Sequence, residues 1–446
     1  MKKRHYVVAP WMLAGLLLAS YLSGCSILPS LPKRSPRGSH GHAFIDYWPS
    51  HETSNQLRLA VKDNIDLKGV VTSAGSQYLA KTSPPASRDA DCLAIARKRN
   101  VRIVGKTNLS EFAVAPSGLN DYFGTPRNPF SKWRKFVPGG SSSGSAVAVA
   151  DGSADIAFGT DSAGSIRVPA ACCGVVGLKT TFGFVSTKGV FPIDSKHLDT
   201  VGPIAKDIAH VVQGMDLLKE GFATRYQAAV ASKPSARMIR IGRLYLSGTD
   251  PKIDKAVDDA LAQGQFKVIA LDQGFKTKWD QAKKDGNTLA AASAWVSDQN
   301  YMSKWGVRLR TKAVILLGRI LYPAQYQDAL KRRFVWRRTL RRIFKKVDFI
   351  ALPTLQTLPP TIPILGEIAI LEAYMLDLQN TVAVNVAGNP ALAIPIPVND
   401  RTIPVTSLQL IGPNSSEADL LNAGRLIEAE HPELELKIHT HKMRAH

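Results

Sequence analysis

Two stretches rich in glycine and serine contain residue types that could carry out nucleophilic chemistry. The first, PGGSSSGS at residues 138–145, lacks the Gly-Lys-Ser/Thr ending of a phosphate-binding Walker loop, which excludes that interpretation. It does contain a G-x-S-x-G pattern centred on Ser142, which is typical of the nucleophile elbow of serine hydrolases. Such an enzyme needs an acid and then a histidine later in the chain. Neither His197 nor His431 lies in a sequence motif that indicates catalysis. The pattern is therefore weak on its own.

The second stretch, GTDSAGSIRVPAA at residues 159–171, offers a better nucleophile in Ser165. Three small residues, Ser162, Ala163 and Gly164, precede it, and a tight turn there could aim successive backbone N–H groups at one point. That arrangement is what an oxyanion hole requires. A serine hydroxyl attacks poorly at its normal pKa and therefore needs a base. Since no histidine is convincing, a lysine is the alternative, as in the Ser-Lys variants of the catalytic triad.

Lys62 is the candidate for this base. A lysine can accept a proton only where burial lowers its pKa far enough to leave the amine neutral. Lys62 ends the apolar stretch LRLAVK at residues 57–62, which predicts a buried strand. A solvated lysine is unexpected there. Spacing alone leaves open a structural role for Lys62, as the ion-pair partner of Asp63 or Asp66.

These stretches closely resemble the signature of the amidase signature family. The resemblance covers residues 57 to about 430 and is most specific at residues 136–190. It includes the following sequences, in the order of the family: VKDNIDLKGVVTSAGS (61–76), GKTNLSEFA (105–113), GGSSSGSAVAVADG (139–152), GTDSAGSIRVPAACCGVVGLKTT (159–181), LDTVGPIAKD (198–207), VDFIALPT (347–354), NVAGNPALAIPI (385–396) and LQLIG (408–412).

The resemblance implies a catalytic triad of Lys62, Ser141 and Ser165, in which a cis peptide bond holds Ser141. Neutral Lys62 would draw a proton from Ser141, which would draw one from Ser165, so that Ser165 attacks an amide carbonyl. The backbone N–H groups from Ser162 to Ser165, including those of Ala163 and Gly164, would hold the oxyanion. Ser142 then becomes a supporting residue, Asp161 and Arg167 orient the loop, and no metal or cofactor is expected.

Three departures from the family pattern concern the turn, the N-terminus and the substrate pocket. Ala163 stands where many members carry Gly, and alanine would be strained if that position required a positive φ. The helices that usually precede the lysine strand are missing from the sequence before Leu57. Residues 210–345, which help to form the acyl pocket in this family, are short and atypical. The resemblance therefore does not define the substrate.

The elements around the motifs alternate between strand and helix. We expect strands at 57–62, 101–104 and 155–159, the second closed by Gly105, and helices at 89–99 and 145–150. A last helix should begin at Ser415/Ser416. The alternation predicts an α/β architecture with a mostly parallel sheet. Together with the resemblance, it predicts a single α/β domain at residues 51–446, with a twisted mixed β-sheet surrounded by helices.

The N-terminus predicts export and a lipid anchor. Lys2, Lys3 and Arg4 precede an apolar run at 11–22, which is too short for a membrane-spanning helix of about 20 residues. The sequence LSGC at 22–25 resembles a bacterial lipobox, which implies cleavage before Cys25 and lipidation of its sulfur. A plain N-terminal anchor is the alternative. Residues 1–25 are thus predicted to be a lipoprotein signal peptide and 26–50 a flexible tether. In Gram-negative lipoproteins, a residue such as Ser26 after the lipidated cysteine usually directs the protein to the outer membrane. We therefore expect the protein at the periplasmic face of that membrane.

Composition and charge add expectations about partners. Of the 446 residues, 45% are hydrophobic and 21% charged, and the formal net charge is +21. This charge indicates either anionic neighbours or simply a solvated basic surface. No nucleic-acid motif accompanies the charge, so no nucleic-acid partner is expected. The basic stretch 324–346 predicts either a surface helix packed on the core or a helix lying on anionic lipid. Cys92, Cys172 and Cys173 should be buried free cysteines.

The sequence therefore predicts an exported, lipid-anchored amidase of the cell envelope that acts on a small-molecule amide, and it leaves the oligomeric state open. Two alternatives remain: a catalytically silent lipid-anchored binding protein, and a protein like the A subunit of tRNA-dependent amidotransferases. Export argues against the second. A penicillin-recognising enzyme is disfavoured because the only Ser-x-x-Lys tetrad of the sequence, residues 30–33, lies in the tether.

Overall fold

A single mixed sheet of eleven strands runs through the described part of the chain, which in this computed structural model comprises residues 40–48, 56–132, 134–363 and 368–432. Its strand order is β1-β3-β2-β4-β6-β5-β10-β11-β9-β7-β8. The strands are β1 (Phe44–Tyr47), β2 (Arg58–Lys62), β3 (Arg102–Thr107), β4 (Ile156–Asp161), β5 (Val176–Lys179), β6 (Thr200–Ala205), β7 (Arg240–Arg243), β8 (Lys267–Ala270), β9 (Phe349–Pro353), β10 (Ala391–Pro397) and β11 (Val405–Ile411).

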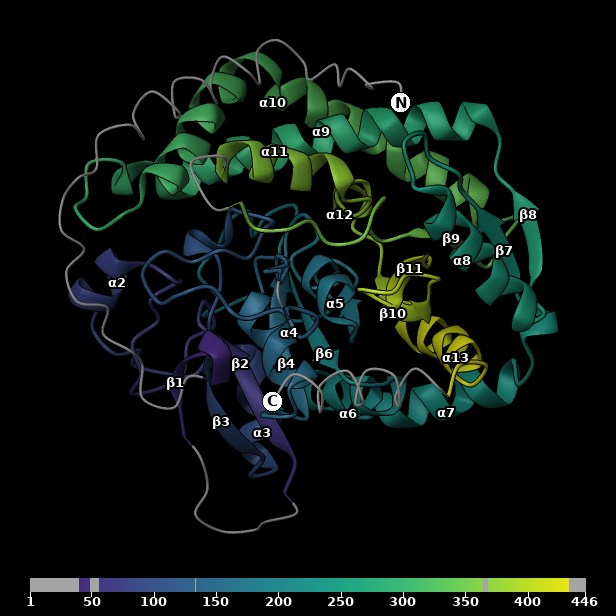
Figure 1. The fold of residues 1–446 in the computed structure, drawn as a ribbon, viewed down its shortest axis with the longest axis horizontal. Coiled ribbons are helices and arrows are strands. Elements are labelled where there is room, and N and C mark those ends of the chain that lie inside the picture. Colours follow the sequence, from purple (N-terminus) through teal and green to yellow (C-terminus); the bar gives the residue numbers. More distant parts are fainter. Residues whose placement is uncertain (1–39, 49–55, 133, 364–367, 433–446) are drawn as a thin grey trace.

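Helices surround this sheet (Figure 1). They are α2 (Gln77–Thr82), α3 (Ala94–Lys98), α4 (Ser143–Ala150), α5 (Arg167–Cys173), α6 (Ile208–Leu218), α7 (Phe222–Ser232), α8 (Pro251–Gln263), α9 (Gln273–Asp298), α10 (Leu309–Ile343), α11 (Ile368–Leu378), α12 (Val382–Ala387) and α13 (Glu417–Glu428), with 3-10 turns η1 (His40–His42), η2 (Asp91–Leu93), η3 (Glu111–Ala113), η4 (Ala236–Met238) and η5 (Gln299–Tyr301). None of the described helices is long and apolar enough to cross a membrane.

The sheet confirms the expected mixed α/β domain but corrects the expectation that it is mostly parallel. Six of the ten strand pairings are antiparallel, including β4 with β6 and β10 with β11. Only the pairings of β2 with its two neighbours and of β7 with its two neighbours are parallel. A strand that is buried on both faces appears in the sequence as a continuous apolar run. Such a run does not show whether the strand pairs with its neighbours in parallel or in antiparallel fashion.

The parallel trio β3-β2-β4 positions the chemistry-bearing residues. β2 is buried from Leu59 to Lys62, and β4 is buried throughout. Because parallel strands end at the same edge of a sheet, Lys62 at the end of β2 and Asp161 at the end of β4 lie at one edge. The expected strand at 101–104 continues through Gly105 to Thr107 as β3. The expected helix at 89–99 divides into η2 and α3.

The predicted tether is wrong at its C-terminal end. The sequence predicts flexible chain over residues 26–50, but β1 pairs with β3 in antiparallel fashion, and Phe44 is only 1% exposed. The Phe44 ring contacts the Tyr47 ring at 4.7 Å between centroids. This four-residue strand is too short to stand out from the Pro- and Ser-rich sequence around it. The signal peptide, Cys25 and the first part of the tether lie outside the described residues.

Candidate active site

Lys62 is fully buried and hydrogen-bonded to two hydroxyl groups. Its Nζ donates to Oγ of Ser141 at 2.7 Å and to Oγ1 of Thr160 at 2.8 Å. Thr160 Oγ1 also accepts from Nδ2 of Asn64, at 3.0 Å. Burial lowers the pKa of Lys62 to about 7, although the charges of Asp161 and Asp199 oppose this. A substantial fraction of Lys62 is therefore neutral at neutral pH and able to accept a proton.

The structural alternative for Lys62, an ion pair with Asp63 or Asp66, does not occur. Asp63 pairs instead with Lys106, with 3.1 Å between Nζ and Oδ1, and it also accepts hydrogen bonds from Ser73. Asp66 accepts from Oγ1 of Thr72 at 2.7 Å. The buried lysine at the end of β2 thus faces hydroxyl groups and no directly bonded carboxylate.

Ser141 lies in the tight loop before α4, and the Gly140–Ser141 peptide bond is cis, as the family resemblance implies. Ser141 is fully buried, and its carbonyl accepts the N–H of Ser110 at 3.3 Å. Gly140 allows this close packing, because a Cβ there would lie 2.6 Å from the carbonyl oxygen of Ala115. The next N–H, that of Ser142, donates to the carbonyl of Ser165 at 3.1 Å. This hydrogen bond joins the two serine-bearing loops.

Ser165 lies in the turn between β4 and α5 and is half-buried, whereas Lys62 and Ser141 are fully buried. The carboxylate of Asp161 shapes this turn by accepting the N–H of Gly164 at 2.8 Å and the N–H of Ile166 at 3.1 Å. Of the three predicted triad members, Ser165 is therefore the one that a substrate can reach.

The predicted oxyanion-hole residues differ in which N–H groups remain available. The N–H of Gly164 is taken by Asp161, and the carbonyl of Ala163 accepts from Oγ1 of Thr381 at 2.6 Å, so the peptide between Ala163 and Gly164 is fixed at both ends. This removes Gly164 from the free donors. In the described part of the chain, no acceptor takes the N–H of Ser162, Ala163 or Ser165. These three remain as candidate donors.

The strain expected at Ala163 does not arise. The positive φ of this turn falls on the next residue, Gly164, at 138°, and Ala163 is not among the non-glycine residues with positive φ. A Cβ at Gly164 would lie 2.2 Å from Oγ1 of Thr381. The position that needs glycine in this chain is therefore 164, and alanine at 163 is accommodated.

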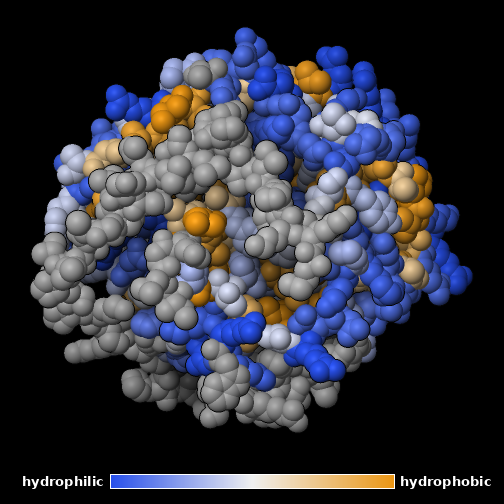
Figure 2. All heavy atoms as spheres, turned by 45° about the horizontal axis from the view of Figure 1, so that its top comes forward, coloured by the Kyte–Doolittle hydropathy of each residue, from blue (hydrophilic) through white to orange (hydrophobic). Residues whose placement is uncertain are grey.

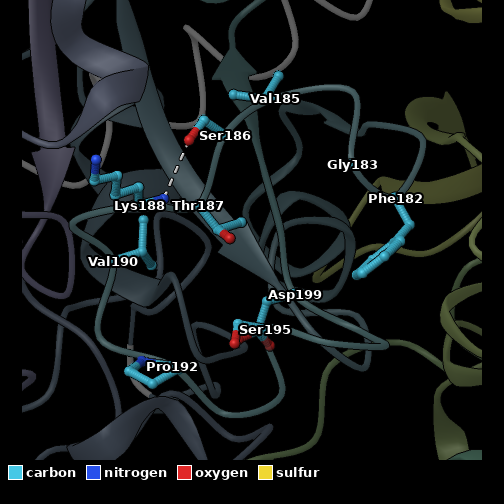
Figure 3. Close-up of a pocket in the computed structure, with 10 residues that line it drawn as sticks. All are labelled: Phe182, Gly183, Val185, Ser186, Thr187, Lys188, Val190, Pro192, Ser195 and Asp199. Carbon is cyan, nitrogen blue, oxygen red and sulfur yellow. Dashed lines mark hydrogen bonds between the residues drawn. The ribbon is translucent and has the colours of Figure 1, made fainter.

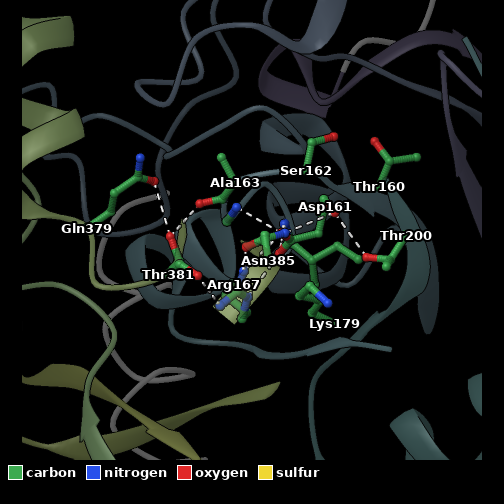
Figure 4. Close-up of polar contacts among 12 residues, drawn as sticks. Thr160, Asp161, Ser162, Ala163, Arg167, Lys179, Thr200, Gln379, Thr381 and Asn385 are labelled. Atoms are coloured by element: carbon green, nitrogen blue, oxygen red, sulfur yellow. Dashed lines mark hydrogen bonds and ion pairs between the residues drawn. The ribbon is translucent and has the colours of Figure 1, made fainter. Parts of the chain in front are cut away.

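A buried charge network holds the nucleophile turn in place (Figure 4). Arg167 pairs with Asp161 at 3.0 Å and donates to Oε1 of Gln409 at 2.6 Å and to Oδ1 of Asn385 at 2.5 Å. Burial alone would raise the pKa of Asp161, but the neighbouring Arg167 charge lowers it to about 2. The nucleophile turn is thus tied, as expected, through Asp161 and Arg167. The distant partners at 381–409 could not be inferred from spacing.

Replacing Arg167 by methionine should destabilise the fold, because it leaves the Asp161 carboxylate buried without its cation. Loss of one partner of a buried ion pair costs about 3–5 kcal/mol in free energy of unfolding. Urea unfolding followed by circular dichroism measures this cost. The control is Arg225→Met, because Arg225 is exposed on α7, and it should change stability by less than about 0.5 kcal/mol. Equal stability of the two variants would contradict the assigned role of Arg167.

Asp199 connects the nucleophile turn to a pocket of about 520 Å³ (Figure 3). Its carboxylate accepts from Oγ of Ser162 at 2.6 Å and from the N–H groups of Ile193 and Asp194. Phe182, Val190 and Pro192 are among the residues that line the pocket. A second pocket, of about 460 Å³, shares Val190 and is lined by the rings of Phe191 and Tyr301.

Aromatic rings cluster beside the second pocket. The ring centroids of Phe112 and Phe191 lie 5.5 Å apart, and those of Phe112 and Tyr301 lie 4.9 Å apart. The N–H of Phe191 donates to the carbonyl of Asn64 at 2.7 Å, two residues after Lys62. The backbone at Phe191 is therefore tied to the segment that follows Lys62.

The nucleophile-elbow hypothesis for Ser142 finds no support in the geometry. The Ser142 hydroxyl donates to the carbonyl of Thr160 at 3.4 Å, and His197 contacts Asp194 instead, with 3.1 Å between Nδ1 and Oδ1. Cys92, Cys172 and Cys173 are buried and free, as predicted. Within the described ranges, no group of three or more His, Cys, Asp or Glu side chains could hold a metal ion.

Several supporting residues carry no signal of their own in the sequence. Thr160 reads as a packing residue and Asn64 as the end of a strand, yet both contribute to the hydrogen bonding of Lys62. Thr381 and Asp199 do not stand out either, although each holds one end of the nucleophile turn. All four lie in or next to the sequences that resemble the family, which is the signal that could have drawn attention to them.

Known proteins match this chain over most of its length. A family model for amidases matches residues 57–421. The A subunit of a glutamyl-tRNA(Gln) amidotransferase from Halobacterium salinarum is 33% identical over 416 residues, which cover 83% of this chain and 94% of that protein. A 2-amino-5-chloromuconic acid deaminase from Comamonas testosteroni is 33% identical over 392 residues, covering 84% and 81% respectively.

Among solved structures, the A subunit of the glutamyl-tRNA(Gln) amidotransferase from Thermotoga maritima matches with a TM-score of 0.72 and 26% identity, over 87% of each chain. The family model and the curated relatives thus match most of the chain, and the solved structure shares its fold. The chain belongs to the amidase signature family.

Proposed function

We propose that this protein is an amidase that hydrolyses the C–N bond of a carboxylic amide through an acyl-enzyme on Ser165. The observation that carries the proposal is the 2.7 Å hydrogen bond between buried Lys62, whose pKa is lowered to about 7, and Ser141. A neutral amine in that position can act as a general base without a histidine. The proposed substrate is a small amide, with no metal or cofactor in the reaction.

In the proposed reaction, neutral Lys62 accepts the proton of Ser141 while Ser141 accepts the proton of Ser165. The oxygen of Ser165 forms a bond to the amide carbon, and the carbonyl electron pair moves onto oxygen. The N–H groups of Ser162, Ala163 and Ser165 are the candidate donors that stabilise that oxyanion. The proton then returns through Ser141 to the leaving nitrogen, the C–N bond breaks, and water later hydrolyses the ester on Ser165. Thr160 holds the Lys62 amine in place through its 2.8 Å hydrogen bond.

A panel of amides tests the proposal. Aryl and fatty-acyl amides come first because Phe191 and Tyr301 line the pocket of about 460 Å³. Peptide-terminal and short aliphatic amides follow, with release of the amine or ammonia as the measurement. The wild-type protein should turn over at least one class, and Ser165→Ala should turn over none. A folded wild type that hydrolyses no amide and accepts no covalent serine probe would favour the silent binding protein.

The identity to amidotransferase A subunits supports a second candidate function, in which the amide is glutamine. Free glutamine in the panel distinguishes the two. The second candidate would be supported if glutamine were the only amide hydrolysed. It would also be supported if hydrolysis required a glutamyl-tRNA amidotransferase partner and its tRNA. Hydrolysis of other amides without any partner supports the amidase.

We also propose that the enzyme is exported and anchored by a lipid on Cys25, at the periplasmic face of the outer membrane. The supporting sequence is LSGC at residues 22–25 after a basic start and an apolar run. Cys25→Ser should prevent lipidation, because no sulfur remains to be acylated. The unprocessed or unlipidated protein should then differ from wild type in gel mobility and membrane fractionation. A Cys25→Ser protein that matures and fractionates as wild type does would contradict the anchor.

A further inference from the structure

The inner side of α10 is fully engaged with the protein. Trp336 is 4% exposed, and its Nε1 donates to the carbonyl of Ala383 at 2.8 Å. Arg333 and Arg337 extend to the neighbouring helix α12. They donate to the carbonyls of Val386 and Ala387, each at 2.8 Å. The alternative of a helix packed on the core is thus confirmed for this side.

The opposite side of α10 combines exposed apolar and basic side chains. Phe334 is 71% exposed and Val335 is 63% exposed, which is unusual for residues of their size. Residues three or four apart share one side of a helix, so these two lie among neighbouring exposed cations. We define the outer face of α10 by the residues Lys331, Phe334, Val335, Arg338, Arg341 and Arg342.

The cations at the C-terminal part of this face have no acidic partner. Arg338, Arg341 and Arg342 have no carboxylate within 4.0 Å among the described residues, and the same holds for exposed Lys345 just beyond the helix. By contrast, Arg332 at the side of the helix pairs with Asp285 at 2.7 Å. Lys331, at the N-terminal end of the outer face, pairs with Asp328 at 3.2 Å. The charges available to an external anion are therefore those of Arg338, Arg341 and Arg342.

The helix lies where an extended flat partner can reach it. Figure 1 shows α10 beside α9 at the top of the molecule. On the face in Figure 2, apolar side chains appear as separate groups among hydrophilic ones. From Lys331 to Arg342 the outer face extends over about 16 Å at 1.5 Å per residue, so several lipid headgroups could contact it at once.

We propose that the outer face of α10 binds the surface of an anionic lipid bilayer. An interfacial helix needs apolar side chains to enter the headgroup region and cations to attract anionic lipid, and this face provides both. A purely polyanionic partner would use the cations but would gain little from Phe334 and Val335. The proposal does not depend on catalysis or on the lipid predicted at Cys25. Both would place the enzyme at a membrane, but through different parts of the chain.

A nitroxide at position 334 tests the contact directly. Full-length Cys25→Ser protein with Phe334→Cys offers one exposed thiol among the described residues, because Cys92, Cys172 and Cys173 are buried and burial raises the pKa of Cys92 to about 12. With phosphatidylglycerol-containing vesicles, the label should become more accessible to oxygen and less accessible to a soluble nickel chelate. The matched control is Met238→Cys, because Met238 is 51% exposed and lies on η4, outside the outer face of α10, so its label should stay aqueous.

Charge variants provide a second, independent measurement. Each basic residue at an anionic bilayer should contribute about a fivefold change in vesicle partitioning. Arg338→Gln with Arg341→Gln should therefore weaken binding about 25-fold, whereas Arg225→Gln with Arg237→Gln, which removes the same charge elsewhere, should change it less than about twofold. All variants keep the same N-terminal segment, so any difference reports on the folded surface.

Three outcomes would overturn the proposal. The first is a label at position 334 that stays aqueous while the protein sediments with vesicles, which would place the membrane contact elsewhere. The second is equal binding by the two pairs of charge variants. The third is a result in which heparin shields the label from the nickel chelate as strongly as anionic vesicles do, while the vesicles do not raise the accessibility of the label to oxygen. This result would assign the face to a soluble polyanion.

Discussion

We expect Ser165→Ala to abolish both amide hydrolysis and covalent labelling by a fluorophosphonate. Removal of the nucleophile of a serine hydrolase lowers kcat by about 10⁴–10⁶-fold. The substitution deletes one hydroxyl on a half-buried residue and leaves the backbone hydrogen bonds of the turn in place, including the 3.1 Å bond between the Ser142 N–H and the Ser165 carbonyl. The protein should therefore remain folded while losing its activity.

Ser142→Ala is the matched control for this experiment. Ser142 lies one residue from Ser141 in the other glycine-rich loop, and its hydroxyl makes a 3.4 Å hydrogen bond to the Thr160 carbonyl. Labelling should persist in this variant at close to the wild-type rate. If labelling instead depended on Ser142 and survived Ser165→Ala, the nucleophile-elbow hypothesis would return. The two serines are thus distinguished by one gel.

Local patterns in the sequence pointed to Lys62 and Ser165, whereas the role of Ser141 came only from the resemblance to the amidase signature family. A lysine that ends a buried apolar strand is conspicuous, and small residues before Ser165 predict a tight turn. The parallel pairing of β2 with β4 then places Lys62 near Thr160 without further information. These features depend on residues that are neighbours in the chain or in adjacent strands.

Other parts of the site depend on contacts that no local pattern encodes. Thr381 and Asn385 contact the nucleophile turn from more than 200 residues away, and their hydrogen bonds hold the Ala163 carbonyl and the Asp161 carboxylate in place. The same limit applies to β1, which is stabilised by its pairing with β3 and by burial of Phe44. Strand direction was also not predictable, since antiparallel β6 lies between β4 and β5 and all three are buried.

We expect the pH dependence of fluorophosphonate labelling to report the protonation of Lys62. The amine must be neutral to accept a proton, and its pKa is lowered to about 7 by burial. Labelling should therefore fall about tenfold per pH unit below pH 7 and level off above it, because the protonated form is inactive. Lys62→Ala should lower the rate by about 10³–10⁴-fold, and Lys62→Arg should not restore it, since a guanidinium stays protonated.

Another group could in principle give the same inflection, because burial also lowers the pKa of Lys179 to about 7. Thr160→Val distinguishes the two lysines. Thr160 Oγ1 accepts from Lys62, whereas Lys179 donates to the carbonyls of Thr180 and Asn389. Loss of an acceptor destabilises the ammonium form of Lys62, so the inflection should move down by about one pH unit. An inflection that stays at the wild-type pH in Thr160→Val would mean that Lys62 is not the titrating base.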